Sequence, residues 1–507
     1  MINSLVYILY FFFILFSILG FGLASKKIFK INIADDCYGF IGILGILFIL
    51  IYSYSTNYFF GHDKIHNILF LFFGFLLFIF SIKDKFISYK KELKNTLIIF
   101  SILICAIFIF KSHDDFGYYH FPYTYYLIEQ KIIIGLGQIL QGFRTPSSIF
   151  YFNSMLYLPF AEYYLFNLFP VYILGFSNLI LLKKIFIKDP SKNLIYLRYL
   201  SLLAFIFINI FFYRIGEHGT DRSAQILIFI LIIEILKQVN KIKIDQKNLN
   251  EIYFLTCIII SLKSFYFLYL IFMVPIILKE FRKNIKFKNI FKKFFLNKSF
   301  LISSILIVLV TFSYLFNTGC LIYPVSFTCF EALDWSINKS EVIASNNWFE
   351  LWSKAGATPN YIIENREIYT QDFNWLGIWI NEYFFTKVSD FVIGIFVLCL
   401  VVYFLFYKNG KLKRNKIDIK NFISVYIILL ILLFEWFYNH PALRYGGYCI
   451  VSLVLFIPVS KMLENIIIKK RQYFKVATLL ITISLMVFTG RNINRINTET
   501  KLYNYKP

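Results

Sequence analysis

The chain has 507 residues, of which 59% are hydrophobic, 21% aromatic and only 16% charged. A soluble domain is usually about 45–50% apolar and about 25% charged, and globular cores stop growing at about 250–300 residues. This composition excludes a water-soluble globular protein and predicts a chain for which lipid is the main solvent.

The formal net charge of +23 would raise the question of nucleic-acid binding in a soluble protein. Here the Lys and Arg residues fall mostly in short segments between apolar runs, which is the pattern that orients a membrane protein. We therefore expect the lipid bilayer as a partner and no nucleic acid.

Apolar runs recur along the whole chain, and a bilayer crossing takes about 20 mainly apolar residues. The first run, Ser4 to Ala24, lacks the basic start and the cleavage site of a secretory signal, so we expect it to be retained. The predicted spans, about fourteen in all, are 4–24, 38–58, 66–82, 96–110, 165–182, 194–213, 223–237, 250–262, 264–278, 299–316, 386–407, 421–438, 446–460 and 474–490. The expected fold class is an all-α polytopic transmembrane protein of about 12–14 spans, forming one integral membrane domain over residues 1–507.

The basic segments give these spans a direction. With the spans above, they all fall on one side of the membrane, which the positive-inside rule makes cytoplasmic. These segments are 26–30, 83–94, 183–192, 237–247, 279–298, 408–420 and 461–475. Residues 147–165 are apolar enough to cross, but a crossing there would place the next basic segment outside. We therefore predict an interfacial or re-entrant helix for 147–165.

This topology leaves two long loops outside the cytoplasm, 111–164 and 317–385, both too long to be simple connectors. The first begins with Asp114 and Asp115 directly after a span. A carboxylate at the membrane interface could act as a general base or bind a divalent cation, Mg²⁺ or Mn²⁺. It could equally be a solvated acid that marks the end of a helix.

For other polar residues predicted on the same side, a functional and a purely structural role are again both possible. In the first loop, His120 could contact substrate, and Arg144 could grip a phosphate or face lipid headgroups. Between two later spans, Glu217 and Asp221 are costly so close to hydrocarbon unless they are paired or used. Asp221 could be a second catalytic acid or could cap the next helix.

Three other features lie on this outer side. Lys263 interrupts an apolar stretch and could bind an anionic headgroup or simply snorkel. Cys320 and Cys329 share one loop, where an oxidising compartment favours a disulfide. His440 and Arg444 lie near a proline and a glycine pair and are candidates for binding phosphate.

Together these pieces resemble the GT-C superfamily of glycosyltransferases, and most closely an uncharacterised bacterial group of polytopic membrane proteins. The matching pieces are Asp114-Asp115 with Tyr119-His120, Gly135 to Gln138 leading to Arg144, Gly319 to Pro324, Asp334-Trp335, and Trp436 through Arg444 to Gly447. The resemblance implies a bacterial cytoplasmic-membrane enzyme that moves a sugar from a polyprenyl-phosphate donor to a glycan, lipid or protein acceptor on the outer face.

The resemblance also implies roles for the residues. An acid of the first loop, Asp114 or Asp115, would be the base or would hold a cation, and Asp221 or Glu217 would be the second acid. Basic residues drawn from Arg144, Lys263 and Arg444 would bind phosphate. Two other functions remain open: a polysaccharide polymerase or ligase, and a transporter or flippase of envelope lipids.

Overall fold

The computed structural model describes residues 4–33, 37–83, 86–187, 194–217, 219–241, 243–282, 287–358, 363–412 and 422–505. Some sequence-based expectations concern residues outside these ranges. They are the parts of the basic segments at 84–85, 188–192, 242, 283–286 and 413–420, and the first residue of the predicted span 421–438.

The described chain is nearly all helical. The α-helices of its first half are α1 (Ser4–Ile28), α2 (Tyr38–Asn57), α3 (Lys64–Lys83), α4 (Phe86–Leu103), α5 (Phe121–Glu129), α6 (Leu136–Ile139), α7 (Ser148–Ser154), α8 (Leu168–Ile185), α9 (Ile195–Phe211) and α10 (Asp221–Asn240). Those of the second half are α11 (Gln246–Leu262), α12 (Val274–Phe281), α13 (Phe287–Phe295), α14 (Lys298–Thr318), α15 (Lys339–Lys354), α16 (Arg366–Thr370), α17 (Leu376–Trp379), α18 (Ser389–Lys408), α19 (Ile423–Asn439), α20 (Gly447–Glu464) and α21 (Lys470–Tyr503).

Shorter 3₁₀ and π segments join these helices, and one small sheet is present in the described chain. The segments are η1 (Ile104–Ala106), η2 (Phe116–His120), η3 (Gln141–Arg144), η4 (Tyr163–Leu165), η6 (Ser264–Met273), η7 (Ser326–Thr328), η8 (Ile380–Val388) and η9 (Leu443–Tyr445). The sheet pairs β1 (Lys411–Leu412) with β2 (Ile466–Ile467) in antiparallel register, Lys411 opposite Ile467.

Ten helical stretches among the described residues are long and apolar enough to cross a membrane. They are Ser4–Ile28, Tyr38–Asn57, Lys64–Lys83, Tyr163–Ile185, Asp221–Asn240, Ser264–Phe281, Lys298–Thr318, Leu376–Lys408, Gly447–Glu464 and Lys470–Tyr503. Each coincides with a predicted span. The structure thus confirms an all-α, multi-pass membrane protein.

The other four predicted spans correspond to shorter or more polar helices. The spans at 194–213, 250–262 and 421–438 correspond to α9, α11 and α19, which have 17 residues each. The span at 96–110 divides between the second half of α4 and η1, because lysines and a glutamate occupy the first half of α4.

The helices form an inner and an outer group. In the helical stretch that includes α8, 94% of the residues in the most apolar segment are buried inside the protein. In α10 the corresponding share is 83%. In α3 and α14 the share is 33%, and around α18 it is 28%. A helix that is apolar all round and buried belongs to the centre of a bundle, whereas α3, α14 and α18 present apolar side chains to the surroundings, as lipid-facing helices do.

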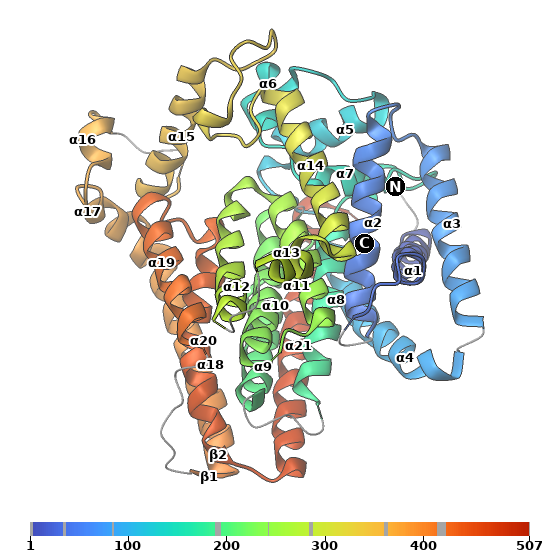
Figure 1. Cartoon of the computed structure of the whole chain (residues 1–507), viewed down its shortest axis with the longest axis vertical. Coiled ribbons are helices and arrows are strands. Elements are labelled where there is room, and N and C mark those ends of the chain that lie inside the picture. Colours follow the sequence, from blue (N-terminus) through green and yellow to red (C-terminus); the bar gives the residue numbers. More distant parts are fainter. Residues whose placement is uncertain are drawn as a thin grey trace.

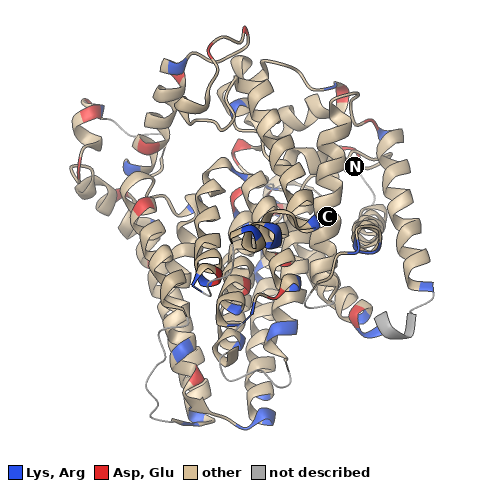
Figure 2. Ribbon diagram, viewed as in Figure 1, with Lys and Arg blue, Asp and Glu red and all other residues tan. Residues whose placement is uncertain are grey.

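The two ends of the molecule differ. In Figure 1 the helices α5 and α6 of the first long loop and α15 of the second lie at the upper end, and β1 and β2 lie at the lower end. Figure 2 shows that Lys and Arg predominate at the lower end, whereas the upper end carries both Lys or Arg and Asp or Glu. The two long loops are therefore neighbours in space, although α8 to α14 separate them in the chain.

Residues 147–165 form no continuous helix. They contain α7, which has seven residues and is entirely buried, and the short η4. A helix of seven residues is about 10 Å long, a third of the thickness of the hydrocarbon core. This stretch therefore does not cross the membrane as a single helix.

Buried amides join α8 to α9 in the inner group. The Asn178 side-chain amide donates to Asn209 Oδ1 at 3.0 Å, and the Asn209 amide donates to Asn178 Oδ1 at 2.8 Å. Both side chains are fully buried. Each therefore satisfies the polar group that the other would otherwise leave unpaired in an apolar bundle.

Replacing either asparagine alone by leucine should destabilise the protein by about 1 kcal/mol, which is in the range measured for interhelical hydrogen bonds in membranes. The double variant Asn178→Leu/Asn209→Leu should recover part of that loss, because it leaves no unpaired amide. Thermal unfolding of the detergent-purified variants, followed by size-exclusion chromatography, measures this. Losses that simply add in the double variant would contradict the pairing.

Candidate functional site

The first long loop brings two histidines and an aspartate together within one turn. The Asp115 N–H donates to His113 Nδ1 at 3.1 Å, and Asp115 starts the π-helical turn η2, which ends at His120. The wider turn of η2 brings the His120 ring against that of His113, with 5.7 Å between the ring centroids. Asp114 is exposed to solvent.

Four charged side chains from four parts of the chain form the centre of the site. Arg444 donates from Nε to Asp221 Oδ2 at 2.9 Å and from Nη2 to Asp115 Oδ2 at 3.3 Å. Lys263 pairs with the other oxygen of Asp221. We call Asp115, Asp221, Lys263 and Arg444 the charge cluster.

Helix ends and turns place these charges. Asp221 is the first residue of α10, and Lys263 lies between α11 and η6. Arg444 lies in η9, which ends directly before Gly446. The φ of Gly446 is +96°, a conformation that glycine adopts without strain. These residues meet because the helix ends and loops that carry them lie at the same end of the bundle.

Burial keeps the histidines of the site neutral at neutral pH. It lowers the pKa of His120 to about 3, with a further contribution from the neighbouring His113. The pKa of His113 is also lowered, first by burial and then by the charge of Arg444. Both rings are therefore uncharged, and each keeps a nitrogen lone pair that can accept a hydrogen bond or bind a metal ion.

A cavity of about 490 Å³ opens beside the charge cluster. Lys263 and His440 supply polar groups to its lining, and Tyr445 covers it next to Arg444. Burial lowers the pKa of His440 to about 4, assisted by Lys354. Most of the remaining wall is apolar and comes from η6 and from residues 322–328 of the second long loop. The cavity thus combines a few charged or polar groups with a largely apolar wall.

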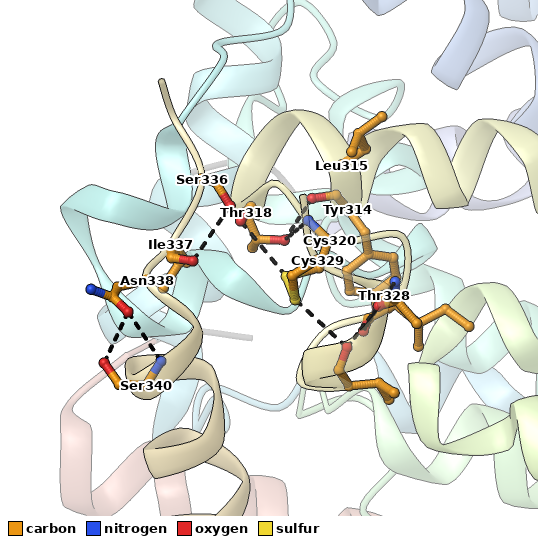
Figure 3. The surroundings of a disulfide bond; sticks show 12 residues. Tyr314, Leu315, Thr318, Cys320, Thr328, Cys329, Ser336, Ile337, Asn338 and Ser340 are labelled. Atoms are coloured by element: carbon orange, nitrogen blue, oxygen red, sulfur yellow. Dashed lines mark hydrogen bonds between the residues drawn. A yellow bond between two sulfur atoms is a disulfide. The ribbon is translucent and has the colours of Figure 1, made fainter. Parts of the chain in front are cut away.

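A disulfide closes the part of the second loop that forms this wall. Cys320 and Cys329 are bonded to each other, and their backbones form a bridge (Figure 3). Inside the closed segment, Thr328 Oγ1 donates to the carbonyl of Val325 at 2.7 Å and accepts from the Ile322 N–H at 3.2 Å. The wall therefore has its own covalent and hydrogen-bonded support.

Aromatic rings cover the cations of the cluster. The guanidinium carbon of Arg444 lies 5.6 Å from the centre of the Trp352 ring, and Lys263 Nζ lies 4.9 Å from that of Tyr445. Trp352 belongs to α15 in the second long loop. Cation–π contacts of this kind stabilise partly desolvated cations.

Not every candidate from the sequence lies in the charge cluster. Arg144 donates to Glu341 Oε2 at 2.9 Å and to the Gly137 carbonyl, so it ties the two long loops together. Glu217 is buried and pairs with Arg214, Arg222 and Arg495. Both candidates therefore support the site from outside it.

The last helix supplies a support that sequence reasoning missed. Arg495 of α21 pairs with Glu217 at 2.6 Å and with Glu499 at 2.8 Å. Glu499 Oε2 accepts the N–H groups of Phe110 and Lys111 at 2.9 and 3.0 Å, at the root of the acidic loop. The only signal in the sequence is the spacing of four residues between Arg495 and Glu499, which places them on one face of a helix.

Glu217→Gln should lower the thermal stability strongly, because three arginines lose their shared buried carboxylate. Breaking a buried ion pair typically costs about 3–5 kcal/mol. Glu341→Gln is the matched control, since its side chain is 57% exposed and surface pairs contribute about 0–1 kcal/mol. Unfolding midpoints in detergent compare the two variants, and equal midpoints would contradict the role assigned to Glu217.

The chain was compared with protein families, with curated proteins and with solved structures. No curated protein and no solved structure matches it significantly. One family model, described as "Domain of unknown function (DUF8201)", matches residues 1–451. That match includes every member of the charge cluster and ends before α21, and it covers most of the chain, which therefore belongs to the DUF8201 family.

Proposed function

We propose that this protein is a membrane glycosyltransferase that moves a sugar from a polyprenyl-phosphate donor to a cell-envelope glycan, lipid or protein acceptor. The observation that carries the proposal is the charge cluster, in which two acids and two cations meet beside a cavity with apolar walls. Displacement at an anomeric carbon needs cations that stabilise the leaving phosphate and a carboxylate base that takes the proton of the acceptor hydroxyl.

Arg444 and Lys263 serve the leaving phosphate in this proposal. The guanidinium of Arg444 and the ammonium of Lys263 have more N–H donors than their bonds to Asp221 and Asp115 use, and both side chains are partly shielded from water. Phosphate oxygens are strong acceptors for such donors. Asp221 holds the two cations in place, and because both of its oxygens are already paired, it is a poor base.

Asp115 serves the acceptor hydroxyl. Its carboxylate side chain is 32% exposed and reaches Arg444 with one oxygen only. It can therefore act on an acceptor as a base or through a cation that it binds, the two roles that the sequence left open. Its neighbour Asp114 is exposed and has no part in the proposed reaction.

The shape of the cavity suits a lipid-linked donor. Lys263 of the charge cluster lines part of it, and apolar residues such as Phe265, Leu268 and Phe327 line much of the rest. A donor with a phosphate and an isoprenoid tail matches that division. With the phosphate at Lys263, which lines the cavity, the attached sugar would lie beside the charge cluster.

The distribution of charge supports an outward-facing site. The lower end in Figure 2, where β1 and β2 pair, is rich in Lys and Arg, and the charge cluster involves the loops of the other end. Under the positive-inside rule the basic end faces the cytoplasm. The proposed location is the cytoplasmic membrane of a bacterium, with transfer on its outer face.

Asp115→Asn should reduce sugar transfer about 10²–10⁴-fold, the usual contribution of a positioned acid–base group. Asp114→Asn should retain most activity, which makes it the matched control for the same substitution one residue away. The assay uses the purified protein in proteoliposomes, a panel of polyprenyl-phosphate hexoses and an envelope extract as acceptor, and measures released polyprenyl phosphate by mass spectrometry.

Two results would overturn the proposal. One is full release of polyprenyl phosphate by the Asp115→Asn variant. The other is movement of the intact donor across the bilayer without any release, which would indicate a flippase.

A further inference from the structure

His113, Asp115 and His120 form a three-residue group within the first long loop. Each offers one ligand atom, and these atoms lie within 4.8 Å of one another. The group arises from local structure, because η2 returns His120 to the position of His113 one turn earlier. It overlaps the charge cluster only at Asp115.

Within the described chain, the ring nitrogens of His120 are buried and unpaired. Its side chain is 3% exposed, and neither ring nitrogen has a hydrogen-bond partner among the described residues. Buried polar side-chain atoms are almost always hydrogen-bonded. The buried imidazole of His120 therefore has a nitrogen lone pair available for a ligand.

The other two residues have atoms to offer. Asp115 faces both His113 and Arg444 with Oδ2, which leaves Oδ1 for a further bond. His113 Nδ1 accepts the N–H of Asp115 at 3.1 Å, a hydrogen bond that a metal on this nitrogen would replace. Both side chains are about one-third exposed or less, so the group is accessible from the loop surface.

The chemistry of the donors selects the ion. Imidazole nitrogens suit zinc and neighbouring transition metals, whereas magnesium and manganese prefer oxygen ligands. Three protein ligands are also typical of catalytic zinc sites, which keep a fourth position for water or substrate. The geometry points to a zinc site formed by His113, Asp115 and His120, with its fourth position left for an oxygen of the substrate.

Binding requires the group to contract. Ligand atoms around a tetrahedral zinc lie about 3.3 Å apart, against the 4.8 Å limit observed here. Rotation of the Asp115 and His113 side chains, which are not tightly buried, can supply this movement, while His120 stays fixed in the protein interior. Zinc would then occupy the position next to Arg444, through the carboxylate that both share.

Zinc binding can be measured without any substrate, so its outcome is independent of the proposed transfer reaction. The full-length protein is purified without a polyhistidine tag, equilibrated with a buffered micromolar zinc solution, and analysed by inductively coupled plasma mass spectrometry. About one zinc per chain should remain bound. Cobalt in place of zinc should give the visible absorption of a tetrahedral site.

His120→Asn and Asp115→Asn should weaken zinc binding at least about tenfold, since even residues that only support a metal ligand contribute that much. His66→Asn is the matched control and should bind like the wild type, because His66 lies outside the group and bonds to Tyr52 and Asn67. Because His120 is buried, His113→Asn provides a second test at a less buried position, and size-exclusion profiles verify that each variant is folded.

A folded wild-type protein that takes up no zinc would overturn the inference. So would variants of His113, Asp115 and His120 that all retain the wild-type stoichiometry and affinity.

Discussion

The carboxylate of Asp221 lies between Lys263 and Arg444, and the end of the bundle that carries the two long loops depends on this arrangement. Charges this close to an apolar interior are costly unless they are paired. One acid at the start of α10 satisfies cations from two other parts of the chain, and Arg444 extends the network to Asp115 in the first loop. The same pairing that offsets the cost of burying these charges also positions the groups that we assign to the proposed reaction.

The sequence predicted the membrane class well because its signal is local. Ten predicted spans coincide with long apolar helices, and each depends only on composition within about 20 residues. The ends of α9, α11 and α19 were predicted less well: α9 and α19 are shorter than their predicted spans and α11 is longer, since composition does not show where a helix ends against its neighbours. The path of residues 147–165 is likewise set by burial of α7 among other elements.

The site was predictable as a set of residue types but not as a constellation. Asp115, Asp221, Lys263 and Arg444 were each suspected because an ionisable group beside an apolar run needs a reason. Nothing in the sequence distinguishes Asp115 from Asp114. In the structure, Asp115 pairs with Arg444, whereas its neighbour Asp114 is exposed. The bonds of Arg144 to Glu341 and of Glu217 to Arg495 join residues far apart in the chain, so neither could be foreseen.

The disulfide between Cys320 and Cys329 ties the cavity to a cellular compartment. The segment that it closes forms part of the cavity wall, and such bonds form in oxidising surroundings but not in the cytosol. A newly inserted chain would therefore close this segment only once the second loop reaches an oxidising compartment. In a chain inserted the other way round, the two thiols would stay reduced and this part of the wall would lack its covalent closure.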